Sequence, residues 1–332
     1  MAIAPPTQPP STLSGVVTTG LDVREETRAY NERLIAKMSG DPPFYEEAEG
    51  PADIQRMRRE GFAGIPPKRQ RARGSDRTVT ALGREVRVRV IRPKDVDGVY
   101  VYLHGGGHVF GSPAAQDEAL WKLAQATNLA VVGVDYRLAP EHPYPAAPED
   151  CEAAAVWLVE HARAEFGSER LVIGGDSAGA HLSVLTLLRL RDTHGLAGAF
   201  RATYLNGGSY DMSLTPSARA FGDARMLVNT PMLVWFRGQF LPGRSPEEMR
   251  DAAISPLYAD LREMPAARFV VGTRDHSLDD ALFMAERWRA AGSPAELEVV
   301  ADAPHGFTLF PLTVAERELA CQQEFLRAAI VN

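Results

Sequence analysis

Cysteine and long apolar runs are both scarce in this sequence. Its 332 residues include only Cys151 and Cys321, and two thiols do not make a disulfide framework in a chain of this size. No stretch approaches the ~20 apolar residues of a membrane span. Residues 1–15 hold four prolines and lack the basic start and apolar run of a secretory signal. We therefore expect a cytoplasmic protein with no membrane partner.

Positive charge is also in the minority. The 43 Asp and Glu residues outnumber the 36 Lys and Arg residues, which gives a formal net charge of −7. Nucleic-acid-binding proteins normally carry a basic face, so no nucleic-acid partner is expected, and the basic run from Lys68 to Arg77 is interpreted as a solvated linker. Apolar residues make up 45% of the chain, which is typical of a folded protein with a sizeable core.

Most of the chain alternates between short apolar runs and helical patterns. The apolar runs, which predict strands, are residues 99–103, 130–134, 171–173, 202–205, 269–271 and 295–300. The helical patterns between them are residues 117–127, 147–164, 177–191 and 278–291. Near-continuous apolar strands that alternate with helices predict an α/β fold, in which a mostly parallel sheet is flanked by helices on both faces.

Some segments depart from this alternation. In residues 86–90, valines alternate with two arginines, which predicts a strand with one wet face at an antiparallel edge of the sheet. Residues 1–20 are interpreted as a flexible strap and residues 21–38 as an amphipathic helix. Residues 210–262 have helical apolar content between two predicted strands. We therefore expect an inserted lid there rather than a separate domain.

A Gly-x-Ser-x-Gly element at residues 175–179 is centred on Ser177. The predicted strand at 171–173 leads into it and a predicted helix leaves it, which is the setting of a nucleophile elbow. Such a turn strains the serine backbone, and the glycines remove the Cβ atoms that would collide there. Ser177 would then project from the C-terminal edge of the sheet as a nucleophile. The alternative interpretation is an ordinary glycine-rich turn.

The run His-Gly-Gly-Gly at residues 104–107 follows another predicted strand. Successive glycines leave their backbone N–H groups unobstructed, as an oxyanion hole requires. In lipases and esterases such a loop acts together with the N–H group of the residue after the nucleophile, which here is Ala178. The alternative is a flexible glycine loop without a catalytic role.

An acid and a base should follow the nucleophile in the order Ser, Asp or Glu, His. Asp275 comes just after an apolar strand, and His305 lies in a loop after the last predicted strand. The interval between them accommodates one helix and one strand. We predict Asp275 as the acid and His305 as the base, with Asp279, Asp280 and Asp302 as rival acids.

Taken together, these residues resemble the hormone-sensitive lipase family of α/β-hydrolases, in its bacterial esterase branch. The resemblance extends from about residue 80 to the C-terminus, with a looser match before it. Three further motifs contribute: Val-Asp-Tyr-Arg-Leu-Ala-Pro-Glu-His at 134–142, Gly-Thr-Arg-Asp at 272–275 and His-Gly-Phe at 305–307. An α/β-hydrolase fold with a helical cap is the implied architecture.

The resemblance also implies how the site and the chain are organised. The oxyanion donors would be Gly106, Gly107 and Ala178, and no metal or organic cofactor would be needed. The expected division of the chain is an N-terminal cap segment 1–75, a first core part 76–209, a cap insertion 210–262 and a second core part 263–332. The cap would roof the acyl pocket. The resemblance also allows a homodimer.

The chain departs from the family pattern near the predicted site. His108 follows the glycines where the family often has an aromatic residue, and His181 stands where it usually has Asn. We treat both as candidates for the substrate pocket. His108 is either a polar wall or a residue packed against the cap, and His181 is favoured as a core residue behind the elbow. His276, which follows the predicted acid in place of the usual Pro, has no assigned role.

By the same resemblance, the expected reaction is hydrolysis of short- to medium-chain carboxylic esters, with a polar or aromatic ester favoured by His108. Ser177 would attack the ester carbonyl, His305 would accept its proton, and Asp275 would orient the imidazole. Two alternatives stay open. One is an amide, carbamate or thioester hydrolase with the same triad, and the other is a non-catalytic small-molecule receptor on the same scaffold.

Overall fold

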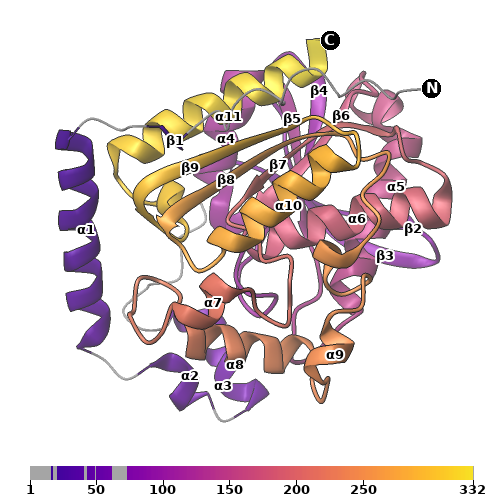
Figure 1. The fold of residues 1–332 in the computed structure, drawn as a ribbon. Helices are drawn as coiled ribbons and strands as arrows, with labels where there is room; N and C mark the ends of the chain where they lie inside the picture. Colours follow the sequence, from indigo (N-terminus) through magenta and orange to yellow (C-terminus); the bar gives the residue numbers. More distant parts are fainter. Residues whose placement is uncertain (1–15, 18–20, 41–42, 49, 62–72, 332) are drawn as a thin grey trace, which may run out of the picture.

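The computed structural model describes residues 16–17, 21–40, 43–48, 50–61 and 73–331 (Figure 1). A nine-stranded sheet crosses the molecule in the strand order β1-β9-β8-β7-β6-β4-β5-β3-β2. The strands from β1 to β5 in this order pair in parallel, whereas β3 is antiparallel to both β5 and β2. The α/β fold predicted from the sequence is therefore confirmed.

The elements follow the alternation seen in the sequence. The strands are β1 (Val16–Val17), β2 (Ser75–Ala81), β3 (Arg84–Ile91), β4 (Gly98–Leu103), β5 (Leu129–Asp135), β6 (Leu171–Asp176), β7 (Phe200–Asn206), β8 (Ala266–Arg274) and β9 (Ala295–Pro304). The α-helices are α1 (Leu21–Ser39), α2 (Phe44–Glu47), α3 (Pro51–Glu60), α4 (Asp117–Thr127), α5 (Ala146–Phe166), α6 (Ala178–His194), α7 (Pro216–Ala220), α8 (Thr230–Phe240), α9 (Pro246–Met249), α10 (Leu278–Ala290) and α11 (Thr313–Val331).

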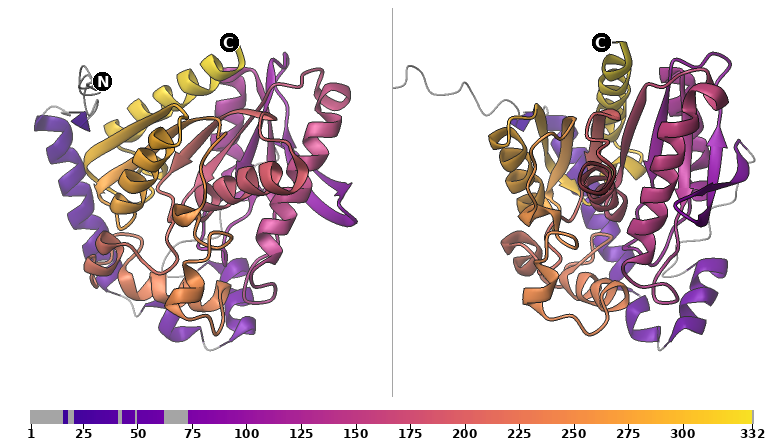
Figure 2. Two further views of the ribbon diagram at one scale, coloured as in Figure 1. Left: turned by 45° about the vertical axis from the view of Figure 1, so that its right-hand side comes forward. Right: turned by 90° about the vertical axis from the view of Figure 1, so that its right-hand side faces the viewer.

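Helices cover both faces of the sheet, as Figure 2 shows. Successive side chains of a strand point to opposite faces. In β4, Val99 and Val101 therefore enter the core formed with α5, α6 and α10, whereas Tyr100 and Tyr102 enter the core formed with α4 and α11. All of β4 is buried, which explains why its sequence is a continuous apolar run rather than an alternating one.

The prediction for residues 86–90 was only partly right. The strand β3 is antiparallel to its neighbours, but β2 rather than β3 is the edge of the sheet among the described strands. Arg89 does not lie on a wet face, because its buried guanidinium forms two hydrogen bonds of 2.5 Å with the carboxylate of Asp117 at the start of α4. The alternating pattern predicted that Arg89 would be exposed to solvent, but the carboxylate of Asp117 compensates its buried charge instead.

Five elements were not predicted: β1, α2, α3, β2 and α11. Residues 16–17, interpreted as part of a flexible strap, instead form β1, which pairs in parallel with β9. The strand β2 is mostly exposed and polar, so it lacks an apolar signal, and α3 lies in a passage that its Gly and Pro content marked as irregular. Residues 1–15 and 18–20 of the predicted strap, and residues 68–72 of the basic run, lie outside the described residues. Residues 75–77 of that run belong to β2 rather than to a linker. No helix in the described part of the chain is long and apolar enough to cross a bilayer.

Two segments far apart in the sequence meet at one end of the sheet. In Figure 1, α2 and α3 lie beside α7, α8 and α9, beyond the carboxyl ends of the parallel strands. The strands β6, β8 and β9 all end there, so the loops that follow them lie under the same helices. In open α/β sheets, ligands bind at this end of the strands. The division of the chain into cap and core stays a prediction.

Candidate active site

Ser177 lies in a strained turn between β6 and α6. Its backbone has φ 55° and ψ −118°, a combination that non-glycine residues rarely adopt. A Cβ atom at Gly175 or Gly179 would come within 2.1 Å or 1.9 Å of the carbonyl oxygen of Leu103, so both positions require glycine. This packing places the Ser177 side chain at the N-terminus of α6, where the helix dipole favours negative charge.

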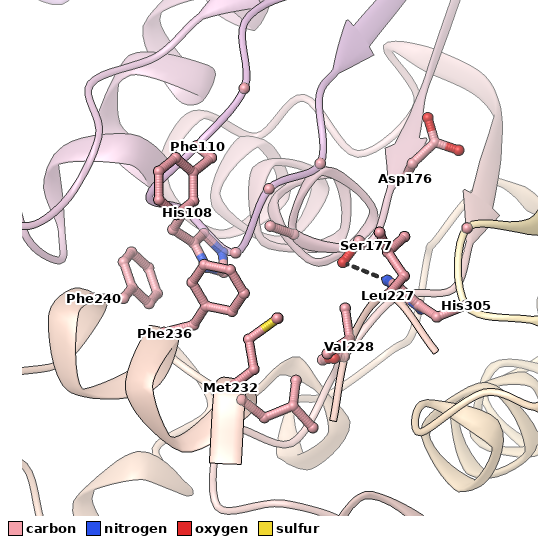
Figure 3. Close-up of a pocket in the computed structure, with 18 of the residues that line it drawn as sticks. His108, Phe110, Asp176, Ser177, Leu227, Val228, Met232, Phe236, Phe240 and His305 are labelled. Atoms are coloured by element: carbon pink, nitrogen blue, oxygen red, sulfur yellow. Dashed lines mark hydrogen bonds between the residues drawn. The ribbon is translucent and has the colours of Figure 1, made fainter. Parts of the chain in front are cut away.

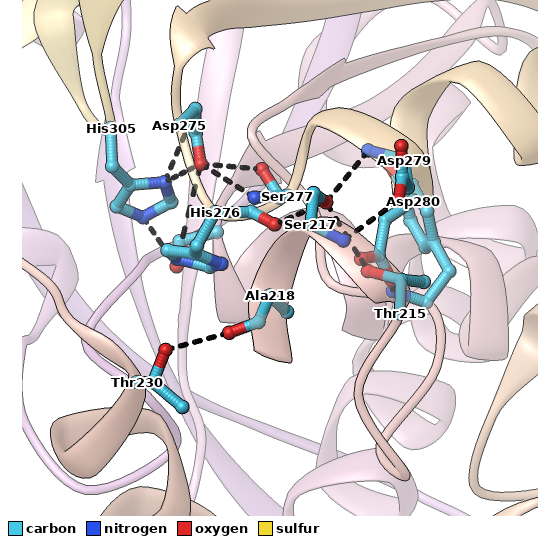
Figure 4. A network of polar contacts seen from close by, with 12 residues as sticks. Thr215, Ser217, Ala218, Thr230, Asp275, His276, Ser277, Asp279, Asp280 and His305 are labelled. Atoms are coloured by element: carbon cyan, nitrogen blue, oxygen red, sulfur yellow. Dashed lines mark hydrogen bonds and ion pairs between the residues drawn. The ribbon is translucent and has the colours of Figure 1, made fainter. Parts of the chain in front are cut away.

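A chain of hydrogen bonds leads from Ser177 to His305 and Asp275. The Nε2 atom of His305 is 3.0 Å from Ser177 Oγ, and its Nδ1 atom is 2.9 Å from each carboxylate oxygen of Asp275. The backbone N–H and the hydroxyl of Ser277 both donate to Asp275 Oδ1 at 2.8 Å (Figure 4). The turn after β6 and the loops after β8 and β9 thus bring together three residues that are distant in sequence.

Burial and charge act in opposite directions on this pair. Burial would raise the pKa of Asp275, but the charge and hydrogen bond of His305 outweigh it and lower the pKa of Asp275 to about 2. Burial would likewise lower the pKa of His305, and the charge and hydrogen bond of Asp275 raise it above its usual value. Asp275 is therefore ionised at neutral pH and holds the Nδ1 proton of His305, which leaves Nε2 free to accept from Ser177.

The rival carboxylates are engaged elsewhere. Asp279 accepts a hydrogen bond from the N–H of Ser217 at 2.7 Å. Asp280 accepts from Thr215 Oγ1 at 2.6 Å and from two backbone N–H groups, and burial raises its pKa to about 7. Asp302 is paired with two arginines of α1. The geometry favours Asp275 over these rivals as the partner of His305.

The glycine run after β4 passes directly beside the elbow. A Cβ atom at Gly105 would be 2.9 Å from the carbonyl oxygen of Asp176. Gly106 has φ 121°, and a Cβ atom there would be 2.2 Å from the carbonyl oxygen of Phe110. Gly107 has φ 61° and faces the ring of Phe236 in α8. Gly106, Gly107 and Ala178 line the same cavity as Ser177 and His305.

The cavity has a volume of about 690 Å³ and lies between the sheet and the helices beyond its carboxyl ends. Figure 3 shows Ser177 hydrogen-bonded to His305 beside Leu227, with the aromatic side chains of Phe110, Phe236 and Phe240 across from them. The side chains contributed by the segments predicted as cap are mainly apolar and include Met38, Phe44, Met57, Leu214, Leu227, Val228, Met232, Leu233, Phe236 and Phe240. Apolar walls with few polar groups are typical of small-molecule sites.

The two histidines predicted for the pocket differ in position. His108 lines the cavity, and its ring stacks on Phe240 with centroids 3.9 Å apart. His181 does not reach the cavity: it is fully buried, and its ring nitrogens contact His108 and the carbonyl oxygen of Ile254. The structure therefore favours the core interpretation of His181 over a place in the pocket wall, because this side chain lies behind His108.

His276, whose role the sequence left open, lines the cavity beside the triad. Its ring centroid is 4.5 Å from that of His305, and both of its ring nitrogens are buried without a hydrogen-bond partner among the described residues. Burial, together with the nearby His305, lowers the pKa of His276 to about 3. One ligand atom each from Asp275, His276 and His305 lies within 4.8 Å of the others, so this cluster could hold a metal ion. The hydrogen bonds that already join Asp275 to His305 and Ser277 favour the triad instead.

Sequence reasoning missed two groups that support the site. Ser277 donates twice to Asp275, and its spacing two residues after that acid fits an Asx-turn, in which an Asp side chain accepts from the backbone N–H two residues on. Asn206 ends the apolar strand β7 and donates to Asp176 Oδ1 at 2.8 Å, while its carbonyl oxygen accepts from the N–H of Ser177. A polar residue at the carboxyl end of a buried strand is the signal that could have identified Asn206.

Known proteins with similar sequences and folds are hydrolases. A family model described as alpha/beta hydrolase fold matches residues 100–309. The chain is 35% identical over 286 residues to the carboxylesterase NlhH of Mycobacterium tuberculosis, covering 82% of this chain and 87% of that protein. It is 31% identical over 241 residues to an ethyl acetate hydrolase of Pseudomonas putida, covering 70% of this chain and 75% of that protein. The solved structure of a hormone-sensitive lipase from a metagenome library matches with a TM-score of 0.74 at 25% identity, covering 92% of this chain and 98% of that one.

Proposed function

The chain belongs to the alpha/beta-hydrolase fold family, among the carboxylic ester hydrolases that resemble hormone-sensitive lipase, and on this premise we propose that Ser177, His305 and Asp275 are its catalytic triad. The observation that carries the proposal is the hydrogen-bonded chain from Ser177 Oγ to His305 and on to Asp275. It lies at the floor of a cavity large enough for a small ester.

Acylation begins when His305 Nε2 accepts the proton of Ser177 as Oγ attacks the ester carbonyl. Negative charge then develops on the carbonyl oxygen. The N–H groups of Gly106, Gly107 and Ala178 donate hydrogen bonds to this oxyanion. In comparable sites one such donor stabilises the transition state by about 3 kcal/mol. His305 next protonates the leaving alcohol, which leaves Ser177 acylated.

Deacylation repeats these steps with water as the nucleophile. His305 accepts a proton from water, the hydroxide attacks the acyl carbonyl, and the carboxylic acid leaves as Ser177 recovers its proton. Asp275 stays ionised throughout because its pKa is low. Its carboxylate therefore stabilises the imidazolium form of His305 in both half-reactions.

The substrates are short- to medium-chain carboxylic esters. Support comes from the apolar walls of the cavity and from the relative described as an ethyl acetate hydrolase. A cytoplasmic location and a homodimer stay predictions.

The decisive experiment compares initial rates of wild type and Ser177→Ala on p-nitrophenyl esters from acetate to palmitate. We expect an optimum at short chains, and a loss of at least about 10³-fold on substitution because the nucleophile is gone. Equal rates for both proteins would contradict the assignment of Ser177. A matched p-nitroanilide series distinguishes an esterase from an amidase, since an amidase would hydrolyse both series at comparable rates.

A further inference from the structure

Two histidines outside the triad are joined to each other beside the glycine loop. His108 Nε2 is 3.1 Å from His181 Nδ1, and His181 Nε2 is 2.7 Å from the carbonyl oxygen of Ile254. Both side chains are buried, with 5% of His108 and 0% of His181 exposed. The mechanism above uses neither imidazole, although polar side chains this deeply buried normally serve a purpose.

The protonation of this pair follows from its partners. A carbonyl oxygen can only accept, so His181 Nε2 carries a proton. Burial lowers the pKa of His181 to about 4 and that of His108 well below its usual value, so both rings are neutral at neutral pH. His181 Nδ1 is therefore bare, so its 3.1 Å contact with His108 is a hydrogen bond when the proton of the neutral His108 ring is on Nε2.

The backbone of His108 needs such an anchor. Its φ is 63°, in the left-handed region that a residue with a Cβ atom adopts only when its surroundings impose it. Three contacts hold His108 in this left-handed conformation. The ring stacks on Phe240 at an interplanar angle of 8°, its Nε2 bonds to His181, and the carbonyl oxygen of His108 accepts from the N–H of Ala139 at 3.0 Å.

The pair connects the two halves of the proposed oxyanion hole. His108 directly follows Gly107, and His181 lies in the first turn of the helix that begins with Ala178. We propose that the His108–His181 pair is a positioning device that holds the N–H groups of Gly106 and Gly107 in register with that of Ala178. The role rests on the proposed function, because the relative position of these donors matters only if an oxyanion forms. Donors act only when they lie about 2.7–3.1 Å from the place that the oxyanion will occupy.

A positioning role predicts a specific kinetic signature. Substrate binding depends mainly on the apolar walls, whereas the oxyanion exists only in the transition state and the tetrahedral intermediate. Misplacing the N–H donors should therefore lower kcat, while KM changes little in His181→Leu, because that side chain does not reach the cavity. A misplacement on the order of 1 Å costs about 100-fold, so we expect a fall in kcat of about 10-fold to 100-fold.

The test uses variants on both sides of the hydrogen bond. His108→Phe keeps the stack on Phe240 but removes the donor, and His181→Leu removes the acceptor. His108→Gln retains an N–H donor and should recover part of the loss. The matched control is His161→Phe, because His161 also stacks on an aromatic ring, that of Trp157 at 9°, but lies on the outer side of α5.

Two inhibitors separate positioning from general damage. A trifluoromethyl ketone binds by addition of Ser177 Oγ to its carbonyl carbon; the proton moves to His305 and the carbonyl electron pair becomes an oxyanion. The corresponding methyl ketone binds without this addition. We expect the inhibition constant of the trifluoromethyl ketone to rise at least about 10-fold relative to that of the methyl ketone in both single variants. The double variant should lose no more than the worse single variant, because the two side chains act as one unit.

Several outcomes would overturn the proposal: an unchanged ratio of the two inhibition constants, additive losses in the double variant, or an equal loss in His161→Phe. Because the ratio does not depend on the concentration of active enzyme, a variant that folds only in part still gives a usable answer. Failure of the proposed function looks different. In that case wild type itself would hydrolyse esters no faster than Ser177→Ala, and the trifluoromethyl ketone would have no advantage even in wild type.

Discussion

Burial lowers the pKa of four histidines of the site, and the net shift depends on whether a carboxylate is hydrogen-bonded to the ring. His108, His181 and His276 are buried without a carboxylate in hydrogen-bond contact, and burial lowers the pKa of each. His305 is equally buried, but its hydrogen bond to ionised Asp275 reverses the effect and raises its pKa. One side chain contact thus separates the proposed base from three imidazoles that stay neutral.

The raised pKa of His305 predicts the pH dependence of the reaction. A base must be unprotonated to accept a proton from Ser177, so kcat/KM should rise with pH through the pKa of His305 and level off above it. The midpoint should lie above the usual imidazole value of about 6.5. Asp275→Asn should move this limb to lower pH, because it removes the charge that raises the pKa, and should lower the plateau by about 10⁴-fold.

The control for this profile is Asp279→Asn, which removes a nearby carboxylate that binds Ser217 rather than His305. Its pH profile should coincide with that of wild type. The assignment of the acid would be contradicted if Asp275→Asn left the acidic limb in place, or if Asp279→Asn moved it.

At the scale of elements, the proposed triad depends on where strands end. Ser177, Asp275 and His305 all follow the carboxyl ends of parallel strands, so the pairing of β6 and β8 with β7, and of β8 with β9, sets their separation. Toward the β2 edge of the sheet, the packing of α4 against β3 includes a polar contact. Arg89 of β3 and Asp117 of α4 form a buried bidentate pair, with 7% and 2% of their side chains exposed.

We predict that Asp117→Ala lowers the free energy of unfolding by about 3–5 kcal/mol, because it leaves the guanidinium of Arg89 buried with only the exposed carboxylate of Asp76 as a partner. Urea denaturation measures this loss. Glu165→Ala is the comparison, since it removes a half-exposed pair with Arg77 and should cost under about 1 kcal/mol. Equal losses in the two variants would show that the burial of the Arg89–Asp117 pair does not matter.

At the scale of the whole molecule, the roof of the cavity is assembled from two distant parts of the chain. Phe44 of α2 packs against Trp235 and Phe236 of α8 and against Phe110 of the glycine loop, with ring centroids 5.4–6.2 Å apart. Only 3% of Phe44 is exposed. Because the aromatic cluster connects both parts of the roof to the loop that follows the glycines, it should determine how firmly the cavity is closed.

We predict that Phe44→Ala opens the roof locally. Truncation of a buried phenylalanine costs about 3–5 kcal/mol, and here the loss falls on a region with few contacts to the sheet. Amide hydrogen exchange in α2 and α8 should accelerate, while the amides of β4 to β8 keep their protection. Phe283→Ala is the control, since Phe283 lies on α10 and is 42% exposed. Uniform acceleration throughout the molecule would contradict a separable roof.

Local requirements on the backbone were readable from the sequence. The turn around Ser177 needs glycines at 175 and 179 because a Cβ atom at either position would collide with the carbonyl oxygen of Leu103. Glycines 105–107 likewise have no room for a Cβ atom, so both motifs indicate their local geometry directly. Buried parallel strands need continuous apolar side chains, which is why their positions were predicted. Polar β2 carries no such signal, and it was missed.

Contacts between distant segments were decided only by the tertiary structure. His108 and His181 are 73 positions apart, and no period or motif relates them; they meet because α6 packs beneath the loop after β4. The alternating pattern around Arg89 does not distinguish a buried arginine from a solvated one. Arg89 is buried and paired because the start of α4 brings Asp117 against it. The sequence by itself thus determined the fold class, the elbow and the glycine loop, because each depends on neighbouring residues. Tertiary packing decided which histidine lines the cavity and which charges are buried, because those depend on long-range contacts between side chains.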